Sequence, residues 1–137
     1  MSRLADLLAR RDCLLADGAT GTNLFAMGLA SGEPPEAWLL ERPDDIRALH
    51  RSFVEAGADI VLTDSFGANR HRLKLHGLEG RVRELNALAA RLGREVADAA
   101  GREVVVAGSI GPTGELFAPL GALTPAEAVE AFREQAE

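Results

Sequence analysis

The sequence predicts an α/β protein in which short strands alternate with amphipathic helices. Three apolar runs, at residues 13–16, 58–63 and 104–107, have the length and composition of buried strands. Apolar residues at helical spacing separate these runs and follow the last one. Alternating strands and helices are typical of βα units, so we expect a parallel sheet.

The N-terminal part of the chain predicts a helix, a short strand and a turn. A helix is expected over residues 2–11, where three leucines follow helical spacing and Ser2 is placed as the N-cap. The apolar run 13–16 then ends at Asp17 and Gly18, a pair typical of turns.

The middle of the chain predicts a loop, a helix and the second strand. Residues 28–43 are rich in proline and glycine, which favours a loop. The fixed φ of Pro43 suits the first position of a helix, and Gly57 suits the left-handed residue that ends one. The β-branched run 58–63 follows directly as the second strand.

The last third of the chain predicts two helices around the third strand. Helical spacing runs from about Gly80 to Gly101, and the strand 104–107 is apolar on both faces, as a sheet covered by helices requires. Thr124 and Glu127 form a capping box that opens the last helix. Its apolar period persists to the end of the sequence, so we expect the helix and the domain to continue.

The composition is that of an ordinary globular domain. The 137 residues include 15 Lys and Arg against 21 Asp and Glu, a net charge of −6 that disfavours a nucleic-acid-binding surface. No apolar stretch approaches the roughly 18 residues of a membrane span, and we expect a cytoplasmic protein without a membrane partner. The single cysteine, Cys13, excludes an internal disulfide and a metal site of several cysteines from this chain. Its place inside the first predicted strand indicates a buried, inert thiol.

Small, polar and glycine-rich segments follow all three predicted strands. The carboxyl ends of parallel strands meet at one face, where α/β folds bind ligands. Thr63, Ser65 and Ser109 can donate hydrogen bonds to a ligand carboxylate, and Asp17 can accept one from an ammonium group. This set suits a zwitterion. Alternation along the strand pairs the two hydroxyls of residues 63 and 65 and turns Asp64 to the other face.

Several polar features also have simpler interpretations. Asp17 and Gly18 can form a turn without any ligand role. The glycines of residues 108–114 suggest a phosphate-binding loop, but the next helix starts about ten residues later, too far for its N-terminus to contribute. The basic cluster of residues 70–76 is interpreted as a solvated loop, and its two histidines, five residues apart, do not form a metal-binding pattern.

Together, the segments 17–22, 57–66 and 107–114 resemble the homocysteine S-methyltransferase family. This family includes betaine–homocysteine methyltransferase and the homocysteine-binding module of cobalamin-dependent methionine synthase. The resemblance covers nearly the whole chain, with the three motifs in the family's order and spacing. It implies a (β/α)8 TIM barrel that binds homocysteine at its C-terminal face and transfers a methyl group to the sulfur, giving methionine.

The resemblance also implies roles for individual residues. Asp17 and Gly18 would hold the amino-acid end of homocysteine, and Thr63 or Ser65 would assist at the second strand, beside Ser109 at the third. The methyl donor would be betaine-like or linked to methyl-cobalamin and folate. In the family, a zinc ion carried by three cysteines deprotonates the homocysteine thiol.

The chain departs from the family at the zinc site. The family's zinc cysteines and a substrate-binding glutamate lie on later strands, and Cys13 matches none of them. With about three of the eight strands of such a barrel, residues 1–137 are expected to be the N-terminal portion of a homocysteine-binding barrel domain, incomplete at its C-terminus and inactive alone. The alternatives are a non-catalytic binding or assembly module, a half-barrel that needs a complementary chain or oligomer, and, more weakly, a small nucleotide-binding domain.

Overall fold

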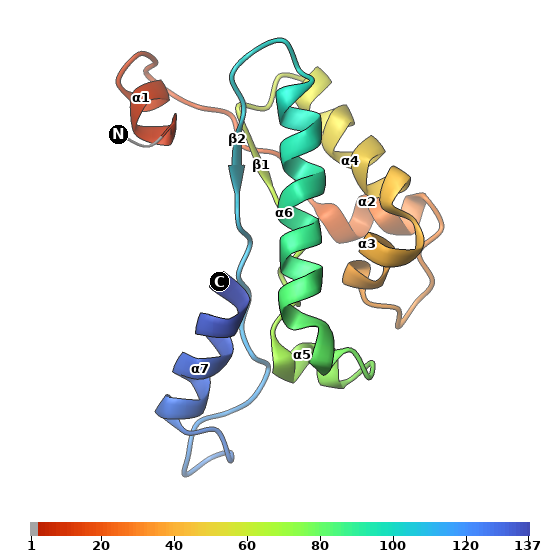
Figure 1. The fold of residues 1–137 in the computed structure, drawn as a ribbon, viewed down its shortest axis with the longest axis vertical. Helices are drawn as coiled ribbons and strands as arrows, with labels where there is room; N and C mark the ends of the chain where they lie inside the picture. Colours follow the sequence, from red (N-terminus) through yellow and green to blue (C-terminus); the bar gives the residue numbers. More distant parts are fainter. Residues whose placement is uncertain (1–2) are drawn as a thin grey trace.

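The structure is a computed structural model that describes residues 3–137 (Figure 1). The expected N-cap, Ser2, lies outside the described residues. In chain order the elements are α1 (Arg3–Leu8), α2 (Thr20–Ala26), η1 (Pro35–Ala37), α3 (Trp38–Glu41), α4 (Pro43–Glu55), β1 (Ile60–Leu62), α5 (Arg70–Lys74), η2 (Glu79–Arg81), α6 (Val82–Asp98), β2 (Val105–Ala107) and α7 (Pro125–Ala136).

Strands β1 and β2 form a parallel pair, as the alternation of strands and helices predicts. Ile60 lies opposite Val105, and Leu62 lies opposite Ala107. The long helix α6 crosses between the two strands and packs against β2 and against α4 (Figure 1). The carboxyl ends of β1 and β2 therefore point the same way, toward the end of the molecule where α5 and α7 lie.

The prediction of a full strand at residues 13–16 is wrong, because Ala16 alone pairs, through a single parallel bridge to Ile60. The hydrogen bonds next to this bridge join Leu15 to Asp59. Its backbone N–H donates to the Leu15 carbonyl at 2.7 Å, and its carboxylate accepts the Leu15 N–H at 3.1 Å. The segment is thus attached beside β1 without a regular ladder. Cys13 is exposed, so the predicted buried thiol is also wrong.

Helices α4 and α6 bury the apolar core. One part of the core lies between the helices, and a smaller part lies between β1, β2 and the C-terminal ends of α4 and α6. The fully buried leucine and isoleucine side chains of the larger part are Leu24, Leu39, Ile46, Leu73, Leu85 and Leu92.

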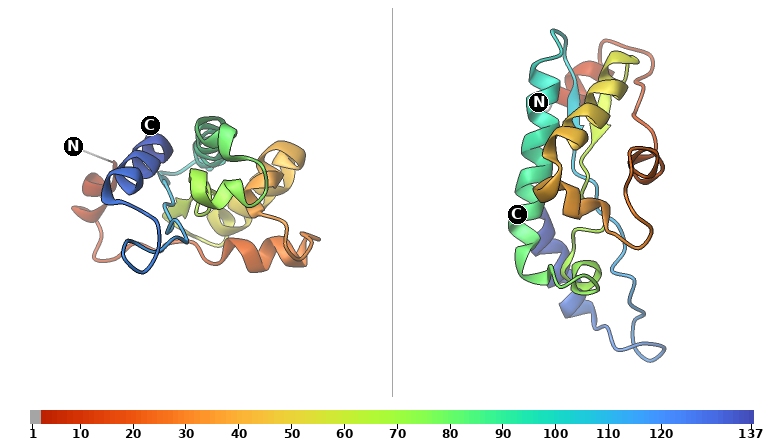
Figure 2. Two further views of the ribbon diagram at one scale, coloured as in Figure 1. Left: turned by 90° about the horizontal axis from the view of Figure 1, so that it is seen from below. Right: turned by 90° about the vertical axis from the view of Figure 1, so that its right-hand side faces the viewer.

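The expectation that the third strand is covered on both faces is wrong. Val105, Val106 and Ala107 are all half-buried. Of the described helices, α6 is the one that packs closely against β2, and it covers one side of the strand pair (Figure 2). The other side of β2 remains accessible to solvent in the described part of the chain.

The predicted boundaries of α4 and the predicted start of α7 are confirmed. Pro43 begins α4, and Gly57 follows it with a φ of 105°, a conformation that favours glycine. At α7 the Thr124 hydroxyl accepts the Glu127 N–H, and the Glu127 carboxylate accepts the Thr124 N–H at 2.8 Å. This is the capping box that the sequence indicates.

Helices α3 and α5 lie where loops are predicted, and α2 lies in a segment for which no helix is predicted. Each is short, of 7, 4 and 5 residues, so apolar periodicity has too few turns to show them. Among residues 3–137, no helix combines the length and apolar character needed to cross a membrane.

Candidate functional site

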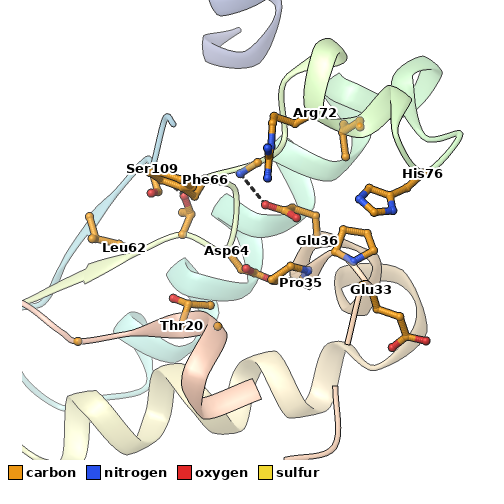
Figure 3. Close-up of a pocket in the computed structure, with 17 residues that line it drawn as sticks. Thr20, Glu33, Pro35, Glu36, Leu62, Asp64, Phe66, Arg72, His76 and Ser109 are labelled. Carbon is orange, nitrogen blue, oxygen red and sulfur yellow. Dashed lines mark hydrogen bonds between the residues drawn. The ribbon is translucent and has the colours of Figure 1, made fainter. Parts of the chain in front are cut away.

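A pocket of about 660 Å³ lies at the carboxyl ends of β1 and β2 (Figure 3). Four parts of the chain meet there: the start of α2, the proline-rich loop with η1, the β1–α5 segment and the segment after β2. Its lining residues are Gly18, Thr20, Gly21, Gly32, Glu33, Pro34, Pro35, Glu36, Leu62, Thr63, Asp64, Phe66, Gly67, Arg72, Leu73, His76 and Ser109.

The predicted hydroxyl pair is present and links the two strand ends. The hydroxyl oxygens of Thr63 and Ser65 are 2.6 Å apart. The Ser65 hydroxyl donates to the Ser109 carbonyl at 2.9 Å, so its single hydrogen is used and Thr63 is the donor within the pair. The Ser109 N–H in turn donates to Thr63 Oγ1 at 2.9 Å. These hydrogen bonds form a closed ring that fixes the strand ends.

The ring changes what these hydroxyls can do. Both hydroxyl hydrogens of Thr63 and Ser65 already have protein acceptors, so neither is free for a ligand carboxylate while the ring is intact. Thr63 and Ser109 line the pocket, whereas Ser65 stands behind them. Gln135 of α7 holds this back layer, because its side-chain amide donates to the Ser65 carbonyl at 2.8 Å.

Asp17 lies beside β1 at the same end. Its Oδ2 accepts the Leu62 N–H at 2.9 Å, and its backbone N–H donates to the Ile60 carbonyl. Its Oδ1 is buried without a hydrogen-bond partner in the described chain. Burial raises the pKa of Asp17, and the hydrogen bond from Leu62 opposes that rise. Asp17 is half-buried behind the pocket wall, and the adjacent Gly18 lines the pocket itself.

Two carboxyl groups that sequence reasoning did not select line the same pocket. Asp64 is 3% exposed and Glu36 is 5% exposed. The Gly67 N–H donates to Glu36 Oε1 at 2.6 Å, which brings the proline-rich loop against the β1–α5 segment (Figure 3). Burial raises the pKa of Asp64 to about 7, and the nearby negative charge of Glu36 adds to the rise. Asp64 follows a strand, which could have identified it, whereas no local pattern identifies Glu36.

A basic wall faces the pocket from α5 and the turn after it. Arg72 and His76 line the pocket there and are exposed, so the prediction of a solvated segment is confirmed for these two side chains, whereas the prediction of a loop is wrong because residues 70–74 form helix α5. Helix α5 forms because the Asn69 side chain accepts the Arg72 N–H at 3.1 Å and caps it. Arg70 points elsewhere and pairs with Glu134 of α7 at 2.8 Å.

The described residues offer no metal site. Within residues 3–137, no group of three or more His, Cys, Asp and Glu side chains is arranged to hold a metal ion. Cys13 precedes the Ala16 bridge and is not among the pocket-lining residues. The residues of this chain therefore do not fit the three-cysteine zinc site that the resemblance implies.

Comparison with known proteins finds relatives that include a methionine synthase and a homocysteine S-methyltransferase. The family model described as homocysteine S-methyltransferase matches residues 14–137. The methionine synthase of Mycobacterium tuberculosis is 35% identical over 97% of this chain, which spans 12% of that protein. The homocysteine S-methyltransferase of Escherichia coli is 35% identical over 84% of this chain, which spans 40% of it. This chain thus covers less than half the length of either relative.

Solved structures agree with the sequence matches. The oxidised form of the homocysteine methyltransferase MmuM from Escherichia coli superposes with a TM-score of 0.75 and 32% identity, over 83% of this chain and 42% of that one. Its metallated form gives a TM-score of 0.73 at 34% identity, over 82% of this chain and 42% of that one. Because the family model covers all but the first 13 residues, the chain belongs to the homocysteine S-methyltransferase family.

Proposed function

We propose that this chain forms the homocysteine-binding strand ends of an enzyme that transfers a methyl group to the homocysteine thiol to give methionine. The observation that carries the proposal is the pocket at the carboxyl ends of β1 and β2, in a chain of this family. Parallel α/β folds, including the (β/α)8 barrel to which we assign these βα units, bind ligands at this end of their strands.

The polar groups at the pocket suit a small amino acid. Asp17 does not line the pocket, but Gly18 next to it does, and Asp17 Oδ1 has no hydrogen-bond partner in the described chain, so it offers an acceptor for one of the three N–H groups of a ligand ammonium. Gly18 leaves the backbone beside it accessible to a ligand carboxylate. At about 660 Å³ the pocket lies within the range of small-molecule sites and has room for a methyl donor beside the amino acid.

Zinc chemistry, where the full-length enzymes use it, falls to residues outside this chain in our proposal. The sequence has one cysteine, and the described residues offer no alternative metal-ligand group. We therefore expect the 137-residue chain to bind homocysteine without methylating it.

A second candidate function is assembly with a complementary chain. The edge of β2 away from β1 has no strand partner among residues 3–137, and strand edges without a partner pair readily with another chain. Large apolar side chains are exposed near the strand ends, namely Leu15, Leu62, Phe66 and Ile110. In that case the pocket would be completed by the partner, and homocysteine affinity would rise when the partner is added.

Isothermal titration calorimetry of the purified chain with L-homocysteine tests the proposal. We expect saturable binding that is weakened by Thr63→Val and unchanged by Thr22→Val, because Thr22 is exposed and does not line the pocket. With a methyl donor and zinc added, methionine should not form. Absence of homocysteine binding would contradict the proposed function, and stoichiometric zinc retained by the chain would contradict the location of the zinc ligands.

A further inference from the structure

Asp64 is a buried carboxyl group that lines the pocket, and its Oδ2 has no hydrogen-bond partner among residues 3–137. Its side chain is enclosed, with the residue 3% exposed, and no donor in the described chain reaches Oδ2. Glu36 supplies a second carboxylate to the same wall and is fixed there by the Gly67 N–H (Figure 3). Two carboxyl groups thus share one enclosed region of the pocket.

Asp59, the other buried aspartate, has a structural role and serves as a comparison for Asp64. Asp59 is 6% exposed, and its carboxylate is paired with Arg11 and Arg102 and accepts the Leu15 N–H. These partners hold the pKa of Asp59 below its usual value, chiefly through the Leu15 hydrogen bond. Asp64 has no such partner. Since an unpaired buried carboxyl group is costly, a ligand is the natural source of the missing donor.

We propose that Asp64 accepts a hydrogen bond from the protonated primary amine of an amino-acid ligand in this pocket, with Glu36 as the second negative charge beside it. The inference rests on the proposed function and deepens it. The amine is that of homocysteine or that of an amino-acid methyl donor, and both sources present the same ammonium group to Asp64.

The chemistry of the pocket selects a primary ammonium group over other cations. Such a group brings the N–H that Oδ2 lacks and the positive charge that two neighbouring carboxyl groups favour. A quaternary ammonium group carries the charge without the N–H. Arg72 and His76 on the α5 wall are suited to the negative end of the same zwitterion.

Calorimetric titration of the full chain with three probes tests this assignment. L-Homocysteine carries an amine and a thiol, L-2-aminobutanoic acid carries the amine without the thiol, and 4-mercaptobutanoic acid carries the thiol without the amine. Asp64→Asn preserves the shape of the side chain and removes its charge. Asp12→Asn is the matched control, because Asp12 is exposed in the loop after α1. Circular dichroism of each variant verifies that it is folded.

We expect Asp64→Asn to weaken the binding of both amine-bearing probes by about tenfold or more, which is the scale of a charge-assisted hydrogen bond. The affinity for 4-mercaptobutanoic acid should stay unchanged. If saturating homocysteine abolishes the binding of 2-aminobutanoic acid, the site at Asp64 holds the amine of homocysteine. If the binding of 2-aminobutanoic acid persists, the site holds the amine of a second ligand. Either result supports the amine site.

The inference is overturned if Asp64→Asn leaves the affinities for the amine-bearing probes unchanged, or if it weakens the binding of all three probes equally. It is also overturned if the wild-type chain binds neither amine-bearing probe. Failure of the proposed function with the amine site intact gives a different result. In that case homocysteine binds no better than 2-aminobutanoic acid, so that the thiol is not recognised, while both amines still depend on Asp64.

Discussion

Replacement of Asp64 by asparagine should remove a large pH dependence from the stability of this chain. Burial raises the pKa of Asp64 from 3.8 to about 7, so the folded protein holds a proton that the unfolded chain releases between these values. The contribution of Asp64 to the free energy of unfolding therefore falls as the pH rises from about 4 to about 7. A shift of about 3 pKa units corresponds to about 4 kcal/mol over that range.

Urea denaturation of wild type and Asp64→Asn, followed by circular dichroism at several pH values from 4 to 8, measures this contribution. The other titrating groups are common to both proteins, so the difference between the two unfolding free energies isolates Asp64. We expect wild type to lose stability relative to the variant by roughly 4 kcal/mol as the pH rises. A difference that is constant with pH, or that changes in the opposite direction, would refute the assignment of a raised pKa to Asp64.

Three further predictions concern the contacts that build the site. Gly111→Ala should destabilise the chain and weaken homocysteine binding, because a Cβ there would lie 2.5 Å from the Phe66 carbonyl oxygen; thermal unfolding and calorimetry measure both effects. Gln135→Met, which keeps the bulk of the side chain but removes the donor to the Ser65 carbonyl, should lower the free energy of unfolding measured by urea denaturation by about 1 kcal/mol. Thr124→Ala should cost about 1 kcal/mol through loss of the α7 cap and leave homocysteine affinity unchanged.

Each of these variants has a result that would count against its reasoning. Gly111→Ala with wild-type stability would mean that the segment after β2 does not approach Phe66 as described. Gln135→Met that matches wild type would mean that α7 does not hold the strand end. Loss of homocysteine binding in Thr124→Ala, at a temperature where the variant is folded, would mean that α7 contributes to the pocket directly.

The long elements were predictable from the sequence because their signals are local. Pro43 and Gly57 mark the ends of α4 through their own backbone preferences, and the Thr124 capping box forms between residues three apart. The first strand was not predictable in the same way. The apolar run 13–16 indicated a buried strand, but Cys13 and Leu15 are exposed, and the pairing at Leu15 depends on the side chain of Asp59, 44 residues away.

The candidate site was predictable where it depends on strand alternation. The Thr63 and Ser65 pair follows from two residues of spacing along an extended chain. The rest depends on long-range packing. Glu36 lines the pocket because its loop contacts Gly67, 31 residues later in the sequence. The sequence around Glu36 has only the composition of a proline-rich loop and gives no local signal of this contact. Likewise, Arg72 faces the pocket only because Asn69 caps a short helix there.

The most direct test of the claim that this pocket binds homocysteine is a titration of the isotope-labelled chain with L-homocysteine, followed by backbone amide chemical shifts. We predict saturable shifts concentrated at Gly18, at residues 63–67 and at Ser109, with the amides of the groove between α4 and α6 near Arg51 unchanged. Shifts concentrated near Arg51, or no saturable shift at the strand ends, would contradict the account.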